Sequence, residues 1–305
     1  MHERVDTVEA PTAIWKGASW WENVQNLSGR LRGNWQLKVG GSMVAAFVVI
    51  ALIIPLFYDY DGEVLKHTIT AKYQAPSFMF WFGTDNFGRD VFARVLWGTR
   101  TTLVIGASSV GFALALGVPL GMLSGYWGRW RDEAMMRVND AFMCLPGLML
   151  ALLLVSVLGS NLWNAILAIG ITYIPRVVRV VRSATIGLKN EEFIIAARAR
   201  GESDAYIVFQ EILPNIWTVV IVEAGIRIGF AIILGAALSY LGLGVQPPAP
   251  GWGLMIYEAR KLIFMAPWTL IFPSVFLALI IISFNILGDG LRRLLDPRER
   301  RDELI

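Results

Sequence analysis

The chain has 305 residues, of which 55% are hydrophobic and 17% charged, and its formal net charge is +3. Soluble domains average about 45–50% apolar and about 25% charged residues, so this composition excludes a disordered chain, a collagen and a disulfide scaffold. The single cysteine, Cys144, excludes an internal disulfide, and the basic residues are too dispersed for a nucleic-acid surface.

The apolar residues fall in six long blocks, several of them near the ~20 residues that span a bilayer core. The blocks are 39–58, 102–126, 141–158, 162–181, 216–243 and 268–288. They are too long for strands of an ordinary sheet, and they lack the ~10-residue alternation of a membrane β-barrel. The sequence therefore predicts an all-α integral membrane protein with six transmembrane helices.

Residues 1–38 are polar and mixed in charge, so the first block is expected to remain as an anchor rather than to be cleaved. Lys and Arg residues set the orientation. If the N-terminus is inside, 19 of them lie on the inner side and 7 on the outer side, with Arg227 left within the fifth block. The positive-inside rule then predicts that both termini are cytoplasmic.

The two long outer loops differ in composition. Loop 59–100 ends in apolar residues at helical spacing, which predicts a short helix from Arg89 to Trp97 lying at the outer interface. Asp90 is suited to its N-cap or first turn, and Trp97 to the headgroup level. Loop 242–253 is rich in Pro and Gly, which favours a defined backbone shape over a floppy loop.

Gly117, Gly121 and Gly125 of the second block repeat every four residues and therefore share one helix face. Small residues on one face let another helix backbone approach closely in a membrane. That helix belongs either to the same chain, which is the simpler interpretation, or to a partner subunit.

Residues 189–214 interrupt the membrane pattern and predict two short helices on the cytoplasmic side. Asn190 is suited to the N-cap of the first helix, which is expected to end at Arg200. Gly201 fits the left-handed residue that commonly follows a helix. Ser203 or Asp204 would cap the second helix, and Pro214 would follow its end.

The apolar side chains of this hairpin are too many for a free solvated loop, so they require a surface to pack against. They are Phe193, Ile195, Ala196, Tyr206 and Phe209. The residues alone leave open whether this surface belongs to the chain itself or to a cytosolic partner.

Several common enzyme signatures are absent from the full sequence. No Gly-Lys dipeptide occurs, so no Walker A loop is possible, and His2 and His67 form no HExxH metal site. There is also no Gly-x-Ser-x-Gly elbow. An enzyme is therefore a poor second interpretation, and ATP hydrolysis, if the protein uses it, must come from another chain.

The hairpin resembles the "EAA" coupling loop of type I ABC importer permeases. Ala196, Ala197, Gly201 and Leu213-Pro214 fall in register with that loop, whereas Ile195 stands where the family has glutamate. Five other stretches, in the right order, resemble the second or C-type permease of dipeptide and oligopeptide importers: 82–91, 124–126, 136–140, 242–248 and 284–297. The resemblance covers about 34–297 and leaves 1–33 unmatched.

This resemblance implies a type I ABC importer permease fold in the cytoplasmic membrane. The expected units are a tail 1–38, an N-terminal helix with its outer loop 39–98, a permease core 99–291 and a tail 292–305. The implied partners are a second, homologous permease, two cytosolic ATPases that use ATP and Mg²⁺, and an external solute-binding protein. No cofactor or metal is expected on this chain.

The resemblance assigns ATPase coupling to the hairpin and transport of di- and oligopeptides to the assembly. The coupling residues are Glu192, Ile195, Ala196, Ala197, Arg198, Gly201, Asp204, Leu213 and Pro214. Permeases of the same pattern also carry nickel complexes, glutathione or opines, and the sequence does not discriminate among these substrates.

Glu223 and Arg227 lie inside the fifth block at a spacing of four, which favours an ion pair along one helix face. Ionisable residues at membrane depth usually face protein or water. The pair is either a polar lining of the translocation pathway or a neutralised structural pair near the cytoplasmic end. A proton-coupled carrier would use such a pair as a relay, but that class leaves the coupling loop unexplained.

Overall fold

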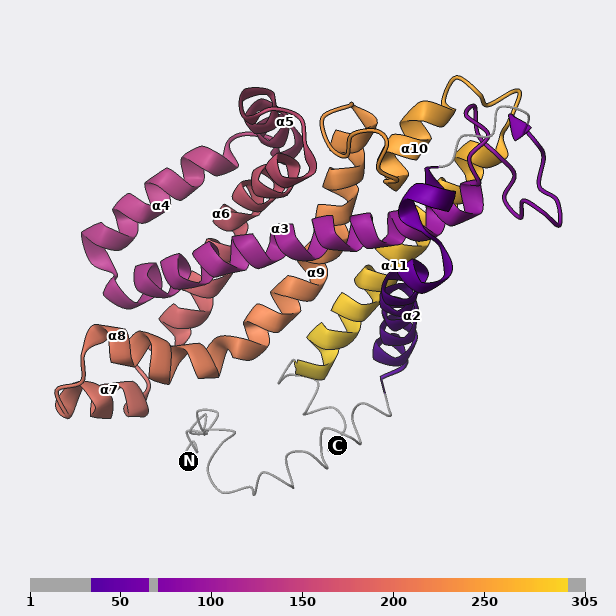
Figure 1. Ribbon diagram of the computed structural model, residues 1–305. Helices are drawn as coiled ribbons and strands as arrows, with labels where there is room; N and C mark the ends of the chain where they lie inside the picture. Colours follow the sequence, from indigo (N-terminus) through magenta and orange to yellow (C-terminus); the bar gives the residue numbers. More distant parts are fainter. Residues whose placement is uncertain (1–33, 66–70, 296–305) are drawn as a thin grey trace, which may run out of the picture.

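The computed structural model describes residues 34–65 and 71–295, and nearly all of the regular structure there is helical (Figure 1). The membrane-sized helices are α2 (Trp35–Phe57), α3 (Val91–Trp127), α6 (Leu162–Leu188), α9 (Leu213–Tyr240) and α11 (Trp268–Leu295). The shorter ones are η1 (Tyr60–Val64), α4 (Arg129–Met143), α5 (Gly147–Leu158), α7 (Glu192–Ala199), α8 (Asp204–Tyr206), η3 (Ile207–Ile212) and α10 (Trp252–Ala259).

Within residues 34–65 and 71–295, five helices are long and apolar enough to cross a membrane, and a sixth span results if α4 and α5 are counted together. The expected third span, 141–158, is wrong as a single helix because α4 and α5 meet at a bend of 86°. Pro146 stands at this break, and a residue before proline is disfavoured in helical conformation. The charged stretch expected as a cytoplasmic loop before it forms most of α4.

The expected short helix from Arg89 to Trp97 is not separate, because α3 runs unbroken for 37 residues from Val91. Asp90 is its N-cap, as predicted, and accepts a hydrogen bond from the Phe92 N–H at 2.9 Å. Trp97 packs on Tyr60, with ring centroids 5.0 Å apart. Glycine disfavours helical structure, so helix propensity alone would favour a break at Gly98. In the structure Gly98 lies within α3 against the Trp252 indole, and this close contact explains the presence of a glycine.

Several helices extend beyond the apolar blocks. Asn34 caps α2 by accepting from the Leu37 N–H at 3.1 Å, so this helix begins before the expected tail 1–38 ends. The Asn34 side chain also donates to the Gly290 carbonyl at 2.8 Å. The start of α2 and the end of α11 therefore lie side by side. The remaining residues of the two tails, 1–33 and 296–305, lie outside the described part of the chain.

The glycine face of α3 packs on α6 within the chain. A Cβ added at Gly117 would lie 2.7 Å from the Val177 side chain, and one at Gly121 would lie 2.8 Å from the Val178 carbonyl oxygen. Gly125 approaches the Arg182 carbonyl as closely. The contact that these glycines permit is thus the main one between α3 and α6, and a partner subunit is not needed to explain it.

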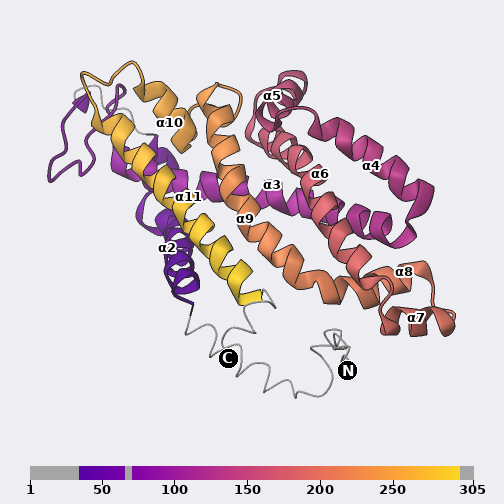
Figure 2. The same cartoon turned by 180° about the vertical axis from the view of Figure 1, so that it is seen from behind.

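The hairpin and the loops at the far side of the molecule lie at opposite ends of the bundle (Figures 1 and 2). The hairpin of α7 and α8 lies at the same end as the start of α2 and the end of α11. The segment 71–90, the loop 241–251 and α10 lie at the other end. The coupling residues that sequence reasoning connected with function lie at the end that holds the hairpin.

Candidate functional site

The hairpin turns at Gly201, as predicted. Gly201 has φ +81°, in the left-handed region that favours glycine. Its N–H donates to the Arg198 carbonyl at 2.9 Å, and the next N–H, of Glu202, donates to the Ala197 carbonyl at 3.2 Å. These two bonds form the Schellman arrangement that closes a helix. The expected N-cap Asn190 is wrong by one position, because Glu191 occupies the cap.

The second helix of the hairpin is capped by Ser203, whose hydroxyl accepts from the Tyr206 N–H at 3.2 Å. It does not end before Pro214, contrary to expectation. The chain passes through the π-helical turn η3 directly into α9, and Pro214 lies in the first turn of α9. A proline is tolerated there because the first N–H groups of a helix have no partner within it.

The hairpin has a buried face and an exposed apolar face. Ile194, Ala197, Ile207 and Val208 are fully buried in the main core. Ile195 is 55% exposed, Tyr206 41% and Phe209 42%, and Ala196 beside them is also exposed. Glu192 and Pro214 are exposed as well, and Leu213 is half-buried. The chain buries one apolar face of the hairpin completely and leaves the side chains of the other about half exposed.

Two charged residues of the hairpin hold it to the end of α3. The Tyr126 hydroxyl and the Trp127 indole N–H both donate to the Asp204 carboxylate, at 3.1 Å and 3.3 Å. The Arg198 guanidinium lies 5.0 Å from the Tyr126 ring centroid, and its Nε donates to the Tyr126 hydroxyl at 3.4 Å. Tyr126 thus connects the two sides of the Gly201 turn. Sequence reasoning noted Tyr126 only as part of a family stretch and missed this contact.

Glu223 and Arg227 form the expected ion pair, with 2.5 Å between the Glu223 Oε1 and the Arg227 Nε. Glu223 is buried, and the Arg227 side chain is 18% exposed. Arg227 is 14 residues from Leu213 and 13 from Tyr240. The pair therefore sits in the middle of α9.

Sequence reasoning missed a buried charge cluster at the opposite end. Arg89 contacts Asp85 at 2.6 Å and Glu258 at 3.3 Å. Arg94 lies 3.9 Å from Asp85 and 3.7 Å from Glu258, and both arginines are at least 97% buried. The cluster ties the segment before α3 to α10. The only signal for it was an arginine, Arg94, set among the apolar residues at the start of α3.

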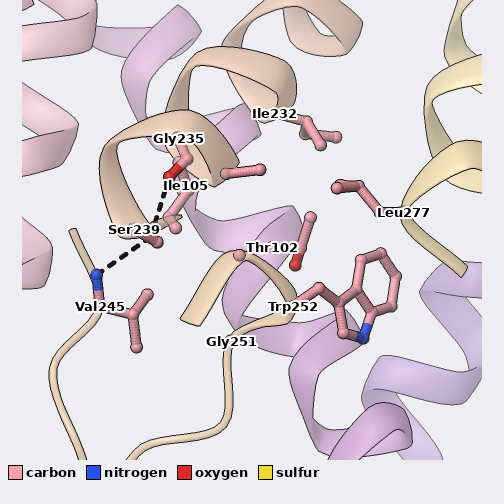
Figure 3. A pocket seen from close by; sticks show the side chains of 11 residues that line it. Thr102, Ile105, Ile232, Gly235, Ser239, Val245, Gly251, Trp252 and Leu277 are labelled. Carbon is pink, nitrogen blue, oxygen red and sulfur yellow. Dashed lines mark hydrogen bonds between the residues drawn. The ribbon is translucent and has the colours of Figure 1, made fainter. Parts of the chain in front are cut away.

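The loop between α9 and α10 is held in place, as its Pro and Gly content predicted. The Ser239 hydroxyl donates to the Gly235 carbonyl at 2.8 Å and accepts from the Val245 N–H at 3.2 Å (Figure 3). The cavity lined by these residues with Trp252 measures only about 10 Å³, about the space of one water. A solute does not fit there.

A larger apolar groove of about 310 Å³ lies between α3, α4 and α6. Met135, Val138 and Phe142 of α4 form one wall, and Ile174 of α6 belongs to the other. Asn139 is the polar residue among its lining, and its side-chain amide donates to the Pro175 carbonyl at 3.2 Å.

These features define an all-helical membrane permease of the type I ABC importer fold. Over 67% of its length the chain superposes on 97% of a chain from the MetNI methionine ABC transporter in its inward-facing conformations, with a TM-score of 0.55 and 20% identity. At that identity the likeness shows the fold alone. Residues 117–301 match the family model described as the binding-protein-dependent transport system inner membrane component. The chain belongs to this family.

Curated relatives share most of the chain. The dipeptide transport system permease protein DppC of Alkalihalophilus pseudofirmus is 42% identical over 269 residues, which is 88% of each chain. The glutathione transport system permease protein GsiD of Pectobacterium atrosepticum is 41% identical over 85% of each chain. GsiD of Escherichia coli O157:H7 is 40% identical over 83% of this chain and 85% of its own length.

Proposed function

We propose that this chain is one of two paired permease subunits in an ATP-driven importer of di- and oligopeptides. The observation that carries the proposal is the exposed apolar face of the hairpin, formed by Ile195, Ala196, Tyr206 and Phe209. An apolar patch next to charged residues on an otherwise core-packed element is typical of a protein interface. The two cytosolic ATPases are the partners that this face fits.

In this proposal the hairpin transmits ATPase closure to the spans. Ile195 and Ala196 enter a groove on the ATPase, and Gly201 sets the angle between the two short helices. Asp204 and Arg198 pass the displacement to α3 through Tyr126. Ala197 anchors α7 in the core, and Leu213 with Pro214 carries the movement into α9 without a break. Glu192 adds charge at the first turn of α7.

The division of the chain follows the same proposal. The permease core is 99–291, with the coupling loop 189–214 within it, and the family match from residue 117 supports most of this range. Segment 39–98 is the addition that precedes the core, although α3 runs unbroken across residues 98 and 99. The residues that precede α2 and those that follow α11 are cytoplasmic tails of a multi-pass protein of the cytoplasmic membrane, and both are shorter than the expected ranges 1–38 and 292–305.

ATP and Mg²⁺ are used by the partner ATPases, and this chain binds no cofactor or metal of its own. The lack of any Gly-Lys dipeptide, and thus of a Walker A loop, supports this assignment. An external solute-binding protein completes the system. A proton-coupled carrier is the weaker alternative. Such a carrier would use the ion pair in α9 as a relay, but it would leave the exposed apolar side chains of the hairpin without a role.

Peptide is the substrate we favour because of the 42% identity to a dipeptide permease. Glutathione is the second candidate because permeases named for it are nearly as similar. The test is uptake of labelled dialanine and glutathione by cells that express the complete gene cluster. We expect uptake of one of them to stop when the ATPases carry a Walker A substitution and to persist with a protonophore. Uptake that follows the proton gradient instead would refute the proposal.

A further inference from the structure

An arginine stands at the centre of α6 without a carboxylate partner among the described residues. Arg176 is 14 residues from Leu162 and 12 from Leu188, or roughly 21 Å and 18 Å along the helix. A bilayer core is about 30 Å thick. The sequence count assigned Arg176 to the inner side. Its place at the centre of the 27-residue helix α6 instead puts it within the depth of the hydrocarbon layer, whichever end faces the cytoplasm.

The neighbouring arginines are neutralised, and Arg176 is not. Arg179 contacts Asp140 of α4 at 2.7 Å, and Arg182 contacts Asp132 of α4 at 2.5 Å. Among residues 34–65 and 71–295, Arg176 makes no ion pair. Its guanidinium instead lies 5.6 Å from the ring centroid of Tyr173, and the side chain is half-buried. The site therefore keeps an uncompensated positive charge.

The surroundings of Arg176 show where this charge faces. Arg179, three residues further along, reaches α4 through Asp140, and α6 also packs against α9. Arg176 thus belongs to a helix that contacts both α4 and α9. Charged side chains at membrane depth face a water-filled cavity or protein rather than lipid. Arg176 is half-buried in the single chain, so this rule directs its guanidinium towards protein or water within the assembly.

The geometry points to Arg176 as the binding site for a carboxylate of the imported solute. A guanidinium offers two parallel N–H groups that match a carboxylate, and the Tyr173 ring centroid lies 5.6 Å from that of Arg176. Glu223 and Asp140 do not compete for it, because each is already paired with another arginine. This inference rests on the proposed function, since both peptides and glutathione carry free carboxylates.

The test measures binding to the assembled complex of two permeases and two ATPases, purified without the solute-binding protein so that only the membrane site contributes. The probes are labelled dialanine and glutathione, each as the free acid and as the carboxyl amide. We expect the wild-type complex to bind one free acid about tenfold or more tightly than its amide, because a charged hydrogen bond is lost in the amide.

Arg176→Gln should remove this preference, and Arg176→Lys should keep part of it. Arg179→Gln is the matched control one turn away and should retain the full preference. Equal binding of acid and amide by the wild type, or an unchanged preference in Arg176→Gln, would overturn the inference. So would dissociation of the Arg176→Gln complex, which would assign the arginine to an ion pair with the second permease.

The proposed function and the inference about Arg176 can be refuted by different results. If cells with the complete system import neither probe in an ATP-dependent way, the proposed function fails, and the inference about Arg176 with it. If they import one of them but the membrane complex does not distinguish acid from amide, only the inference about Arg176 fails.

Discussion

A β-branched residue at Gly201 perturbs the angle of the coupling hairpin and little else. The glycine has φ +81°, and no atom lies within 4 Å of the position that a Cβ would occupy. Any cost of Gly201→Val therefore arises from the backbone conformation and not from a clash. A Cβ in the left-handed region costs roughly 1–2 kcal/mol, and a β-branched side chain costs more.

This strain is small compared with the packing of six spans, but it is large for an interface that depends on the turn. A free-energy change of ~1.4 kcal/mol alters an equilibrium constant tenfold. We therefore expect Gly201→Val to reach the membrane at normal levels, to bind the ATPases roughly tenfold more weakly, and to lose most transport. Membrane abundance, ATPase pull-down and uptake are the three measurements.

Gly187 supplies the matched control. It is also exposed, and an added Cβ would again meet no atom within 4 Å, but it lies in the last turns of α6 in ordinary helical conformation. Gly187→Val should therefore leave pull-down and uptake unchanged. Normal pull-down and uptake by Gly201→Val would refute the reasoning, and equal defects in both variants would show that bulk at this end matters and not the turn.

Three further predictions concern contacts away from the turn. Asp204→Ala should keep ATPase binding but lower the amount transported per ATP hydrolysed severalfold, because the hairpin loses its hydrogen bond to Tyr126 of α3. An unchanged ratio of transport to hydrolysis would contradict a coupling role for this hydrogen bond. Gly121→Leu should cost about 1–3 kcal/mol by overpacking against α6 and lower the melting temperature, whereas Gly111→Leu, in open space, should not; equal melting temperatures would contradict the packing. Arg94→Met should lower the stability of the complex by about 3–5 kcal/mol, because Glu258 is left without its partner. Adding Glu258→Gln to this variant should restore part of the lost stability. If the double variant is no more stable than Arg94→Met, the charge cluster is contradicted.

The sequence predicted the membrane spans because their apolar length is a property of composition. It failed at 141–158 because Pro146 breaks a segment that hydropathy alone reads as continuous. It also failed at Arg89–Trp97, where no local signal shows that a helix continues into the next apolar block. Gly98, inside this continuous helix, packs closely against Trp252, which is distant in sequence.

The sequence predicted those features of the hairpin that depend on neighbouring residues and missed those that depend on distant ones. Gly201 and Ser203 act through local backbone geometry, so their roles could be read from residue type and spacing. The contact of Asp204 with Tyr126 joins residues 78 positions apart, and no periodicity encodes it. The same holds for Arg94 and Glu258, whose pairing depends on how α10 folds back onto α3.

The central claim is that the apolar face of the hairpin contacts the ATPases. Photo-crosslinking from benzoylphenylalanine placed at Phe209 of the hairpin or at Phe78 tests it most directly, because both phenylalanines are exposed. The hairpin and segment 71–90, to which Phe78 belongs, lie at opposite ends of the bundle (Figure 1). The account predicts that the probe at position 209 crosslinks an ATPase subunit in the assembled complex and that the probe at position 78 does not. A crosslink to the ATPase from position 78, or none from position 209, would contradict it.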